Sequence, residues 1–134
     1  QFFCAQEVGK QMIKQKQGKL INISSIAGIQ GYAGSVSYSS SKGGVVLLTK
    51  TLAAEWGKHN INVNAVCPGV FATDMTEDYL ESEEFLNNIK TNVPLKRYAE
   101  PEELVGTIIY LSSEVSNYVT GHALIIDGGW TANL

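Results

Sequence analysis

The chain has 134 residues, of which 44% are hydrophobic and 17% are charged, and it carries 13 Gly and only 3 Pro. This balance is typical of a globular protein and excludes a disordered or fibrous chain, and the length allows one compact domain. Ten basic against thirteen acidic side chains give a formal net charge of −3. The chain therefore lacks the positive field that holds a polyanion, and we expect no nucleic-acid partner.

The apolar segments and the cysteines indicate the compartment. No apolar run approaches the ~18–20 residues of a membrane helix, and residues 1–10 lack the layout of a signal peptide. We therefore expect a cytoplasmic protein with no membrane partner. The two cysteines, Cys4 and Cys67, lie far apart in the sequence, without a second ligand spaced for zinc. They predict two reduced, partly buried thiols and no metal site.

The first part of the chain alternates between helix and strand patterns. Apolar residues recur on one helical face from the start to about Gln15, and we expect Gly18 to stop this helix. Residues 19–25 form a short, apolar, β-branched run, which predicts a strand buried on both faces. A connection rich in glycine and serine then leads to a long helical pattern from about Val36 to His59.

A second strand is predicted over residues 60–67, and the dipeptide Pro68-Gly69 ends it because a strand interior does not accept proline. A strand, a helix and a second strand in this order form a crossover unit. Such units are right-handed in nearly all cases and make the two strands parallel.

The last part of the chain completes an α/β pattern. The acidic residues 74–88 predict one or two short amphipathic helices. Pro101 stands where a first helical residue should be, and the apolar run after it carries a helix to about Ser113. Residues 123–127 predict a third strand. The whole chain is thus expected to form half of an open parallel sheet, with three parallel strands and flanking helices.

Open parallel sheets bind ligands at the carboxyl ends of their strands. Tyr38 and Lys42 begin the long helix at spacing i, i+4, so they are neighbours on one helical face. Making a phenol proton mobile near neutral pH costs about 4 kcal/mol, and a cation about 4 Å away at an effective dielectric of 20 supplies a similar amount. By itself this spacing is more often a solvated surface pair. Ser25 after the first strand makes the combination specific, because its hydroxyl can hold a reacting oxygen.

Several motifs occur in the order found in the short-chain dehydrogenase/reductase (SDR) family, which the chain resembles over its whole length. The resemblance implies that the chain is the carboxyl-terminal half of a Rossmann-type doubly wound sheet. The motifs are Asn22-Ile23-Ser24-Ser25, Tyr38-x-x-x-Lys42, Asn62-Val63-Asn64-Ala65-Val66-Cys67-Pro68-Gly69, Thr73-Asp74-Met75, Val119-Thr120-Gly121 and Asp127-Gly128-Gly129.

The same resemblance implies the role of each site residue. Ser25 orients the substrate carbonyl, Tyr38 passes the proton, and Lys42 binds the nicotinamide ribose and acidifies the tyrosine. Ser24 is structural. The coenzyme is NAD or NADP, the segment after Thr73 forms a substrate lid, and the protein is a homo-oligomer, a dimer or tetramer. The residues that the resemblance assigns to the coenzyme are Tyr38, Lys42, Pro68, Gly69, Phe71 and Thr73.

Two features of the family are missing from the sequence, the Gly-rich TGxxxGxG turn and the NNAG segment. We therefore expect a fragment of a longer protein, or one part of a split enzyme, that is inactive alone.

The expected function is an NAD(P)-dependent oxidoreductase that acts on a secondary alcohol or ketone, with sugar, polyol and gluconate dehydrogenases as the nearest members. A 3-oxoacyl-carrier-protein reductase is the first alternative, although the acidic segment Glu77 to Glu84 would repel its acidic partner. A non-catalytic assembly module is the second.

Overall fold

A computed structural model describes residues 1–132 of the chain. Its single sheet has three strands in the order β1-β2-β3, and both pairings are parallel. The strands are β1 (Gly18–Ile23), β2 (Ile61–Pro68) and β3 (Ala123–Ile126). The predicted strands and their parallel arrangement are therefore confirmed. The predicted end of the second strand is wrong by one residue, because Pro68 belongs to β2 and pairs with Ile126; it is accepted there since β1 does not pair beyond Val66.

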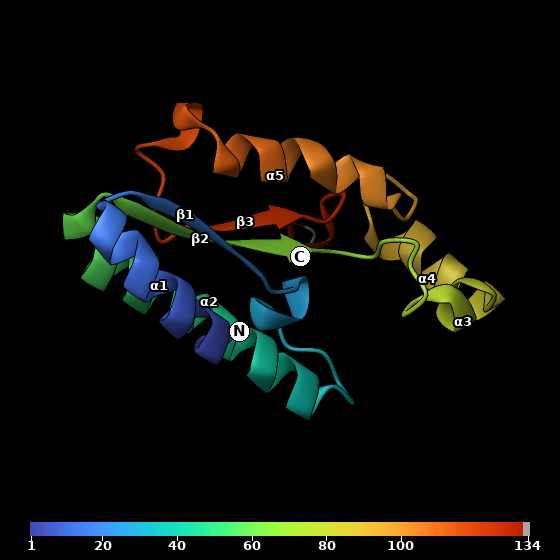
Figure 1. Cartoon of the computed structure of the whole chain (residues 1–134). Coiled ribbons are helices and arrows are strands. Elements are labelled where there is room, and N and C mark those ends of the chain that lie inside the picture. Colours follow the sequence, from blue (N-terminus) through green and yellow to red (C-terminus); the bar gives the residue numbers. More distant parts are fainter. Residues whose placement is uncertain (133–134) are drawn as a thin grey trace.

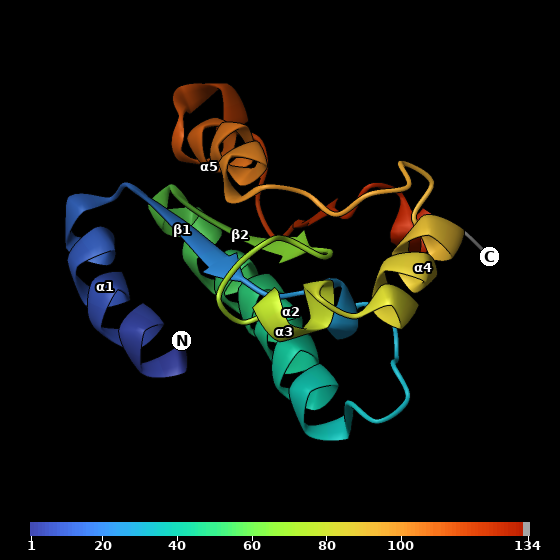
Figure 2. The same ribbon diagram turned by 90° about the vertical axis from the view of Figure 1, so that its right-hand side faces the viewer.

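Helices cover both faces of the sheet (Figure 1). On one face lie α1 (Phe2–Gln15) and α2 (Val36–Trp56), and on the other lies α5 (Val105–Ser112). Figure 2 shows these layers from a second side, with α5 above the sheet and α2 below it. The short helices α3 (Glu77–Leu80) and α4 (Glu83–Asn92) lie beyond the carboxyl ends of the strands. No helix in the described part of the chain is long and apolar enough to cross a membrane.

The burial of β1 differs from the prediction. The sequence predicts a strand buried on both faces, but most of β1 is half-buried and Ile23 is 41% exposed. The reason is that β1 stands at the edge of the sheet, with β2 as its one neighbour among residues 1–132. The central strand β2 instead holds the inaccessible apolar side chains, with Val63 and Val66 both 0% exposed.

The turn between α1 and β1 also differs from the prediction that Gly18 stops the helix. The helix ends at Gln15, and Lys16 adopts the left-handed conformation with φ 54°. The backbone N–H groups of Lys16 and Gln17 donate to carbonyls of the last turn, as in a glycine-capped helix. Gly18 is the first residue of β1, where a Cβ atom would lie 2.5 Å from Met12 Sδ. Glycine at position 18 therefore lets the Met12 side chain pack directly against the backbone of β1.

Two of the predicted helices contain a 3₁₀ turn. The predicted helix from Val36 to His59 is α2 followed by a 3₁₀ turn over Gly57–His59, after which Asn60 is left-handed at φ 60°. The helix predicted to begin at Pro101 opens with a 3₁₀ turn over Pro101–Leu104 before α5.

The main core lies between β1, β2 and the two helices α1 and α2, and Trp56 is its largest buried side chain. Gly9 of α1 is buried against the Trp56 ring. A Cβ atom at Gly9 would lie 2.6 Å from Trp56 Cζ2, which is far inside van der Waals contact. The absence of a side chain at Gly9 therefore sets how closely α1 approaches α2.

The Gly9→Ala substitution is expected to destabilise the protein by about 1–3 kcal/mol, because a rigid indole ring and a helix backbone must move apart. The measurement is the midpoint of thermal unfolding, which should fall by several degrees. Gly44→Ala in α2 is the matched control, because a Cβ atom there would meet no atom within 4 Å. That change should stabilise the helix by up to about 1 kcal/mol, and equal effects of the two substitutions would contradict the packing argument.

Candidate active site

The structure places the predicted site residues around one cleft of about 680 Å³ at the carboxyl ends of β1 and β2. This placement follows from parallel strands, whose carboxyl ends meet at one edge of the sheet. The predicted residues that line the cleft are Ser25, Tyr38, Lys42, Pro68, Gly69, Phe71 and Thr73.

Ser25 stands just past the end of β1 and begins a 3₁₀ turn over Ile26–Gly28. Its Oγ accepts a hydrogen bond from the backbone N–H of Ala27 at 3.1 Å. A hydroxyl can accept two bonds and donate one, so the Ser25 proton is left to donate into the cleft. Ser25 is only 9% exposed, so a ligand can reach its hydroxyl only from the cleft.

Ser24 joins the end of β1 to the first half of α2. Its side chain is buried, and its Oγ donates to the carbonyl oxygen of Lys42 at 2.8 Å. Gly28 lies against the same peptide, because a Cβ atom there would be 2.7 Å from the Lys42 carbonyl oxygen. These contacts hold the strand and the helix in fixed register where the site residues leave them.

Lys42 lies over the ring of Tyr38. The Lys42 Nζ is 5.5 Å from the ring centroid and donates to the carbonyl oxygen of Ile23 at 3.3 Å. The i, i+4 spacing predicts that the side chains of Tyr38 and Lys42 are neighbours. In the structure the Lys42 ammonium also faces the Tyr38 ring, a cation–π contact of about 0.5–1 kcal/mol at exposed sites. Tyr38 is 42% exposed and lines the cleft.

The segment after β2 forms the opposite wall of the cleft. The Gly69 N–H donates to the carbonyl oxygen of Ile126 at 2.8 Å, which extends the β2–β3 pairing by one residue. Thr76 Oγ1 accepts from the Thr73 N–H at 3.0 Å and lies 3.2 Å from Thr73 Oγ1. The Phe71 side chain is buried, so only its backbone is placed to serve a ligand.

A second cavity, of about 590 Å³, shares Ser25, Tyr38, Gly69, Met75 and Thr76 with the first. The aromatic residues of its wall are not among the predicted site residues. The additional side chains lining it include Tyr32, Ser35, Tyr79, Phe85, Asn88 and Trp130.

Tyr32 and Trp130 form one side of this second cavity. Their rings pack edge-to-face with centroids 6.1 Å apart and an interplanar angle of 68°. Burial and the nearby charge of Asp127 raise the pKa of Tyr32, so its hydroxyl stays neutral at physiological pH. A large aromatic side chain in a connection of small residues, shortly before Tyr38, was the available signal in the sequence.

The two cysteines do not match the prediction that both are partly buried, because Cys4 is exposed and Cys67 is fully buried in β2. Burial raises the pKa of the Cys67 thiol, although contacts from Ser24 and Ser25 oppose the shift. The thiol is therefore protonated and is no competing nucleophile beside Ser25. Within residues 1–132, no group of three or more His, Cys, Asp or Glu side chains could hold a metal ion.

Three comparisons relate the chain to known proteins. A family model described as Enoyl-(Acyl carrier protein) reductase matches residues 1–131. The chain is 46% identical over 129 residues to a 3-oxoacyl-[acyl-carrier-protein] reductase of Synechocystis sp., covering 96% of this chain and 50% of that protein. It is 41% identical over 133 residues to gluconate 5-dehydrogenase of Gluconobacter oxydans, with coverages of 99% and 52%.

A solved structure shows the same architecture. The crystal structure of a gluconate 5-dehydrogenase from Burkholderia cenocepacia, in complex with NADP and tartrate, matches with a TM-score of 0.95 at 33% identity. The match covers 97% of this chain and 51% of that one. The chain thus spans about half the length of the curated relatives it matches. Because the family match extends over nearly all its residues, the chain belongs to the short-chain dehydrogenase/reductase family, with three parallel strands of the Rossmann-type sheet.

Proposed function

We propose that this chain is the catalytic and substrate-binding half of an NAD(P)-dependent oxidoreductase. The reaction is hydride transfer between nicotinamide and a secondary alcohol or ketone. The observation that carries the proposal is the convergence of Ser25, Tyr38 and Lys42 on one cleft. A dinucleotide-binding half, on the same polypeptide or on a partner chain, completes the active protein, and residues 1–134 alone are inactive.

Each residue of the convergent group has a distinct task. In the direction of reduction, Tyr38 gives its hydroxyl proton to the carbonyl oxygen of the substrate, and in oxidation it takes that proton back. Ser25 donates a hydrogen bond from its free hydroxyl to the same oxygen as negative charge develops there, and keeps its proton. Lys42 stabilises the negative charge left on the phenol by Coulomb attraction.

The donor groups of the cleft fit a nicotinamide riboside, which supplies or accepts the hydride when bound. The Lys42 ammonium has three donor positions, and the contact to Ile23 is its one hydrogen bond within residues 1–132. Two N–H groups are thus left for ribose hydroxyls. The exposed Thr73 hydroxyl and the backbone of Pro68, Gly69 and Phe71 suit the carboxamide. The NADP bound to the related gluconate 5-dehydrogenase supports this assignment.

The substrate is proposed to be a sugar, a polyol or a gluconate-type acid. The second cavity combines aromatic faces, from Tyr32 and Trp130 among others, with the uncharged polar groups of Ser35 and Asn88. Such a surface packs against C–H groups while it hydrogen-bonds hydroxyls. The likeness to gluconate 5-dehydrogenase supports this class.

A 3-oxoacyl thioester carried on an acyl-carrier protein is the second candidate, and the 46% identical relative favours it. The acidic side chains of α3 and α4, from Glu77 to Glu84, lie beside the cleft and would repel an acidic carrier. A non-catalytic assembly module is the candidate from another class.

The test uses the protein that contains both halves and follows the absorbance of NADH and NADPH. Its substrates are ketoses, aldonates, ketogluconates and a 3-oxoacyl thioester. Turnover of the first three classes supports the proposal, and turnover of the thioester alone favours the second candidate. A folded protein that turns over none of them would favour the assembly module.

We further propose a cytoplasmic homo-oligomer, a dimer or tetramer. Large apolar side chains stand exposed on α1 and α5, including Phe3 at 78% and Ile109 at 62%. Exposed apolar surfaces of this kind mark interaction sites. Size-exclusion chromatography with light scattering, on the protein that contains both halves, measures the number of subunits. A monomer would contradict this assembly.

A further inference from the structure

The segment between β2 and α5 supplies one wall of both cavities. We call residues 73–92, which contain α3 and α4, the lid. Met75 and Thr76 of the lid line the first cavity, and Tyr79 and Phe85 line the second. The position of the lid therefore determines the shape of the space next to Tyr38.

The residues just before the lid are hydrogen-bonded to Ala99, in the loop that follows the lid. The Ala99 N–H donates to the carbonyl oxygen of Val70 at 3.0 Å, and the Ala72 N–H donates to that of Ala99 at 2.9 Å. These bonds form an isolated parallel bridge between Phe71 and Ala99. The bridge lies immediately before Thr73, where the lid begins. Ala99 is the partner on the other side of the bridge.

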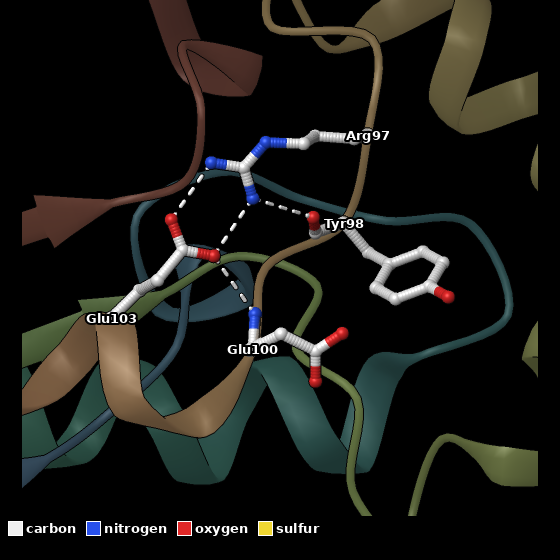
Figure 3. A network of polar contacts seen from close by, with 4 residues as sticks. All are labelled: Arg97, Tyr98, Glu100 and Glu103. Carbon is white, nitrogen blue, oxygen red and sulfur yellow. Dashed lines mark hydrogen bonds and ion pairs between the residues drawn. The ribbon is translucent and has the colours of Figure 1, made fainter.

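An ion pair closes the loop that holds Ala99 (Figure 3). The two terminal nitrogens of Arg97 donate to the two carboxylate oxygens of Glu103, each at 2.7 Å. Arg97 Nη1 also donates to the carbonyl oxygen of Tyr98 at 3.1 Å, and Glu103 Oε2 accepts from the Glu100 N–H at 2.9 Å. We call this arrangement of Arg97 and Glu103 the clamp. The backbone on both sides of Ala99 is thus bonded to the clamp, the Tyr98 carbonyl to Arg97 and the Glu100 N–H to Glu103.

The bridge is poorly packed on one side. A cavity of about 140 Å³ lies there, lined by Val70, Phe71 and Ala99 and by Arg97 and Glu103 themselves. The bridge is thus not held by dense packing on that side, and directional hydrogen bonds must supply part of its order. The hydrogen bond from Arg97 lowers the pKa of Glu103 to about 2, so the pair stays charged at any working pH.

We propose that Arg97 and Glu103 are positioning residues for the substrate cleft. Their ion pair holds Ala99, and through the bridge Ala99 holds Phe71 and the start of the lid. Neither residue lines the two cavities that contain Tyr38, so the pair acts through the backbone. The kinetic consequence depends on the function proposed above, whereas the structural one does not.

The kinetic experiment compares Arg97→Gln with Arg97→Lys in the protein that contains both halves. Loss of the bidentate ion pair in Arg97→Gln should raise the KM for the substrate about tenfold, because the lid shifts relative to the reacting groups. The KM for the coenzyme should rise as well, because the bridge includes Phe71, which borders the proposed carboxamide site. Arg97→Lys should lie between the wild type and Arg97→Gln, because lysine keeps the charge and loses the bidentate geometry. Lys10→Gln is the matched control, since it breaks an exposed ion pair of the same 2.7 Å length on α1.

A second measurement does not depend on activity. Amide hydrogen exchange by NMR should become about tenfold faster at Ala72 and Ala99 in Arg97→Gln, and unchanged in Lys10→Gln. Unchanged exchange at both amides would overturn the inference whatever the kinetics, and so would faster exchange with an unchanged substrate KM in an active enzyme. Faster exchange in a protein that turns over no substrate would leave the clamp standing and reject the proposed function.

Discussion

Replacing Tyr38 by phenylalanine is expected to lower kcat at least about a hundredfold, the usual range for loss of a general acid. The substitution removes one hydroxyl that lines the cleft, and no described residue donates to it or accepts from it. Folding should therefore be unaffected, and the thermal midpoint should match that of the wild type. The measurement is kcat at saturating substrate and coenzyme.

Tyr118→Phe is the control for this substitution, because Tyr118 is fully exposed and lies outside both cavities. It removes the same hydroxyl with no expected change in kcat. A Tyr38→Phe protein that keeps wild-type turnover would take the proton transfer away from Tyr38. The proposed mechanism would then have to be abandoned.

Replacing Lys42 by alanine is expected to impair two separate quantities. The coenzyme should bind about tenfold or more weakly, because charged hydrogen bonds to its ribose are lost. The kcat should fall about a hundredfold, because the cation that lies 5.5 Å from the Tyr38 ring centroid is gone. A fluorescence titration gives the coenzyme Kd, and initial rates at saturation give kcat.

Lys50→Ala provides the comparison, because Lys50 is an exposed residue of the same helix α2 outside the cleft. Both quantities should be unchanged in that variant. A Lys42→Ala protein with a lower kcat but an unaltered coenzyme Kd would contradict the ribose contact while keeping the electrostatic role.

The alternation of helix and strand was predictable because it depends on local patterns. The apolar run before Ser24 and the Pro68-Gly69 dipeptide set the ends of β1 and β2, and a helix between two strands implies a parallel pair. The local apolar run indicates burial on both faces and does not by itself give the exposure of Ile23, because the burial of a strand also depends on how many neighbours it has. Lys16 in a left-handed cap was missed because glycine is the usual residue there.

The same division applies to the candidate site. Parallel strands meet at one edge, so the convergence of Ser25, Tyr38 and Lys42 could be predicted from chain order alone. The side-chain torsions that lay the Lys42 ammonium over the ring could not, because the i, i+4 spacing fixes only proximity. The contact between Tyr32 and Trp130 joins distant parts of the chain, and no local pattern in the sequence indicates it.

The hydrogen bond from Ser24 to the Lys42 carbonyl bears on how this fold can vary among descendants. It fastens β1 directly to α2, and the close approach of Gly28 seals the same joint. The exposed loop between them has open space around Gly31 and Gly34. Insertions or deletions beside Gly31 or Gly34 should accordingly shift Tyr32 and Ser35, which line the second cavity, and change substrate preference while the joint between β1 and α2 stays intact.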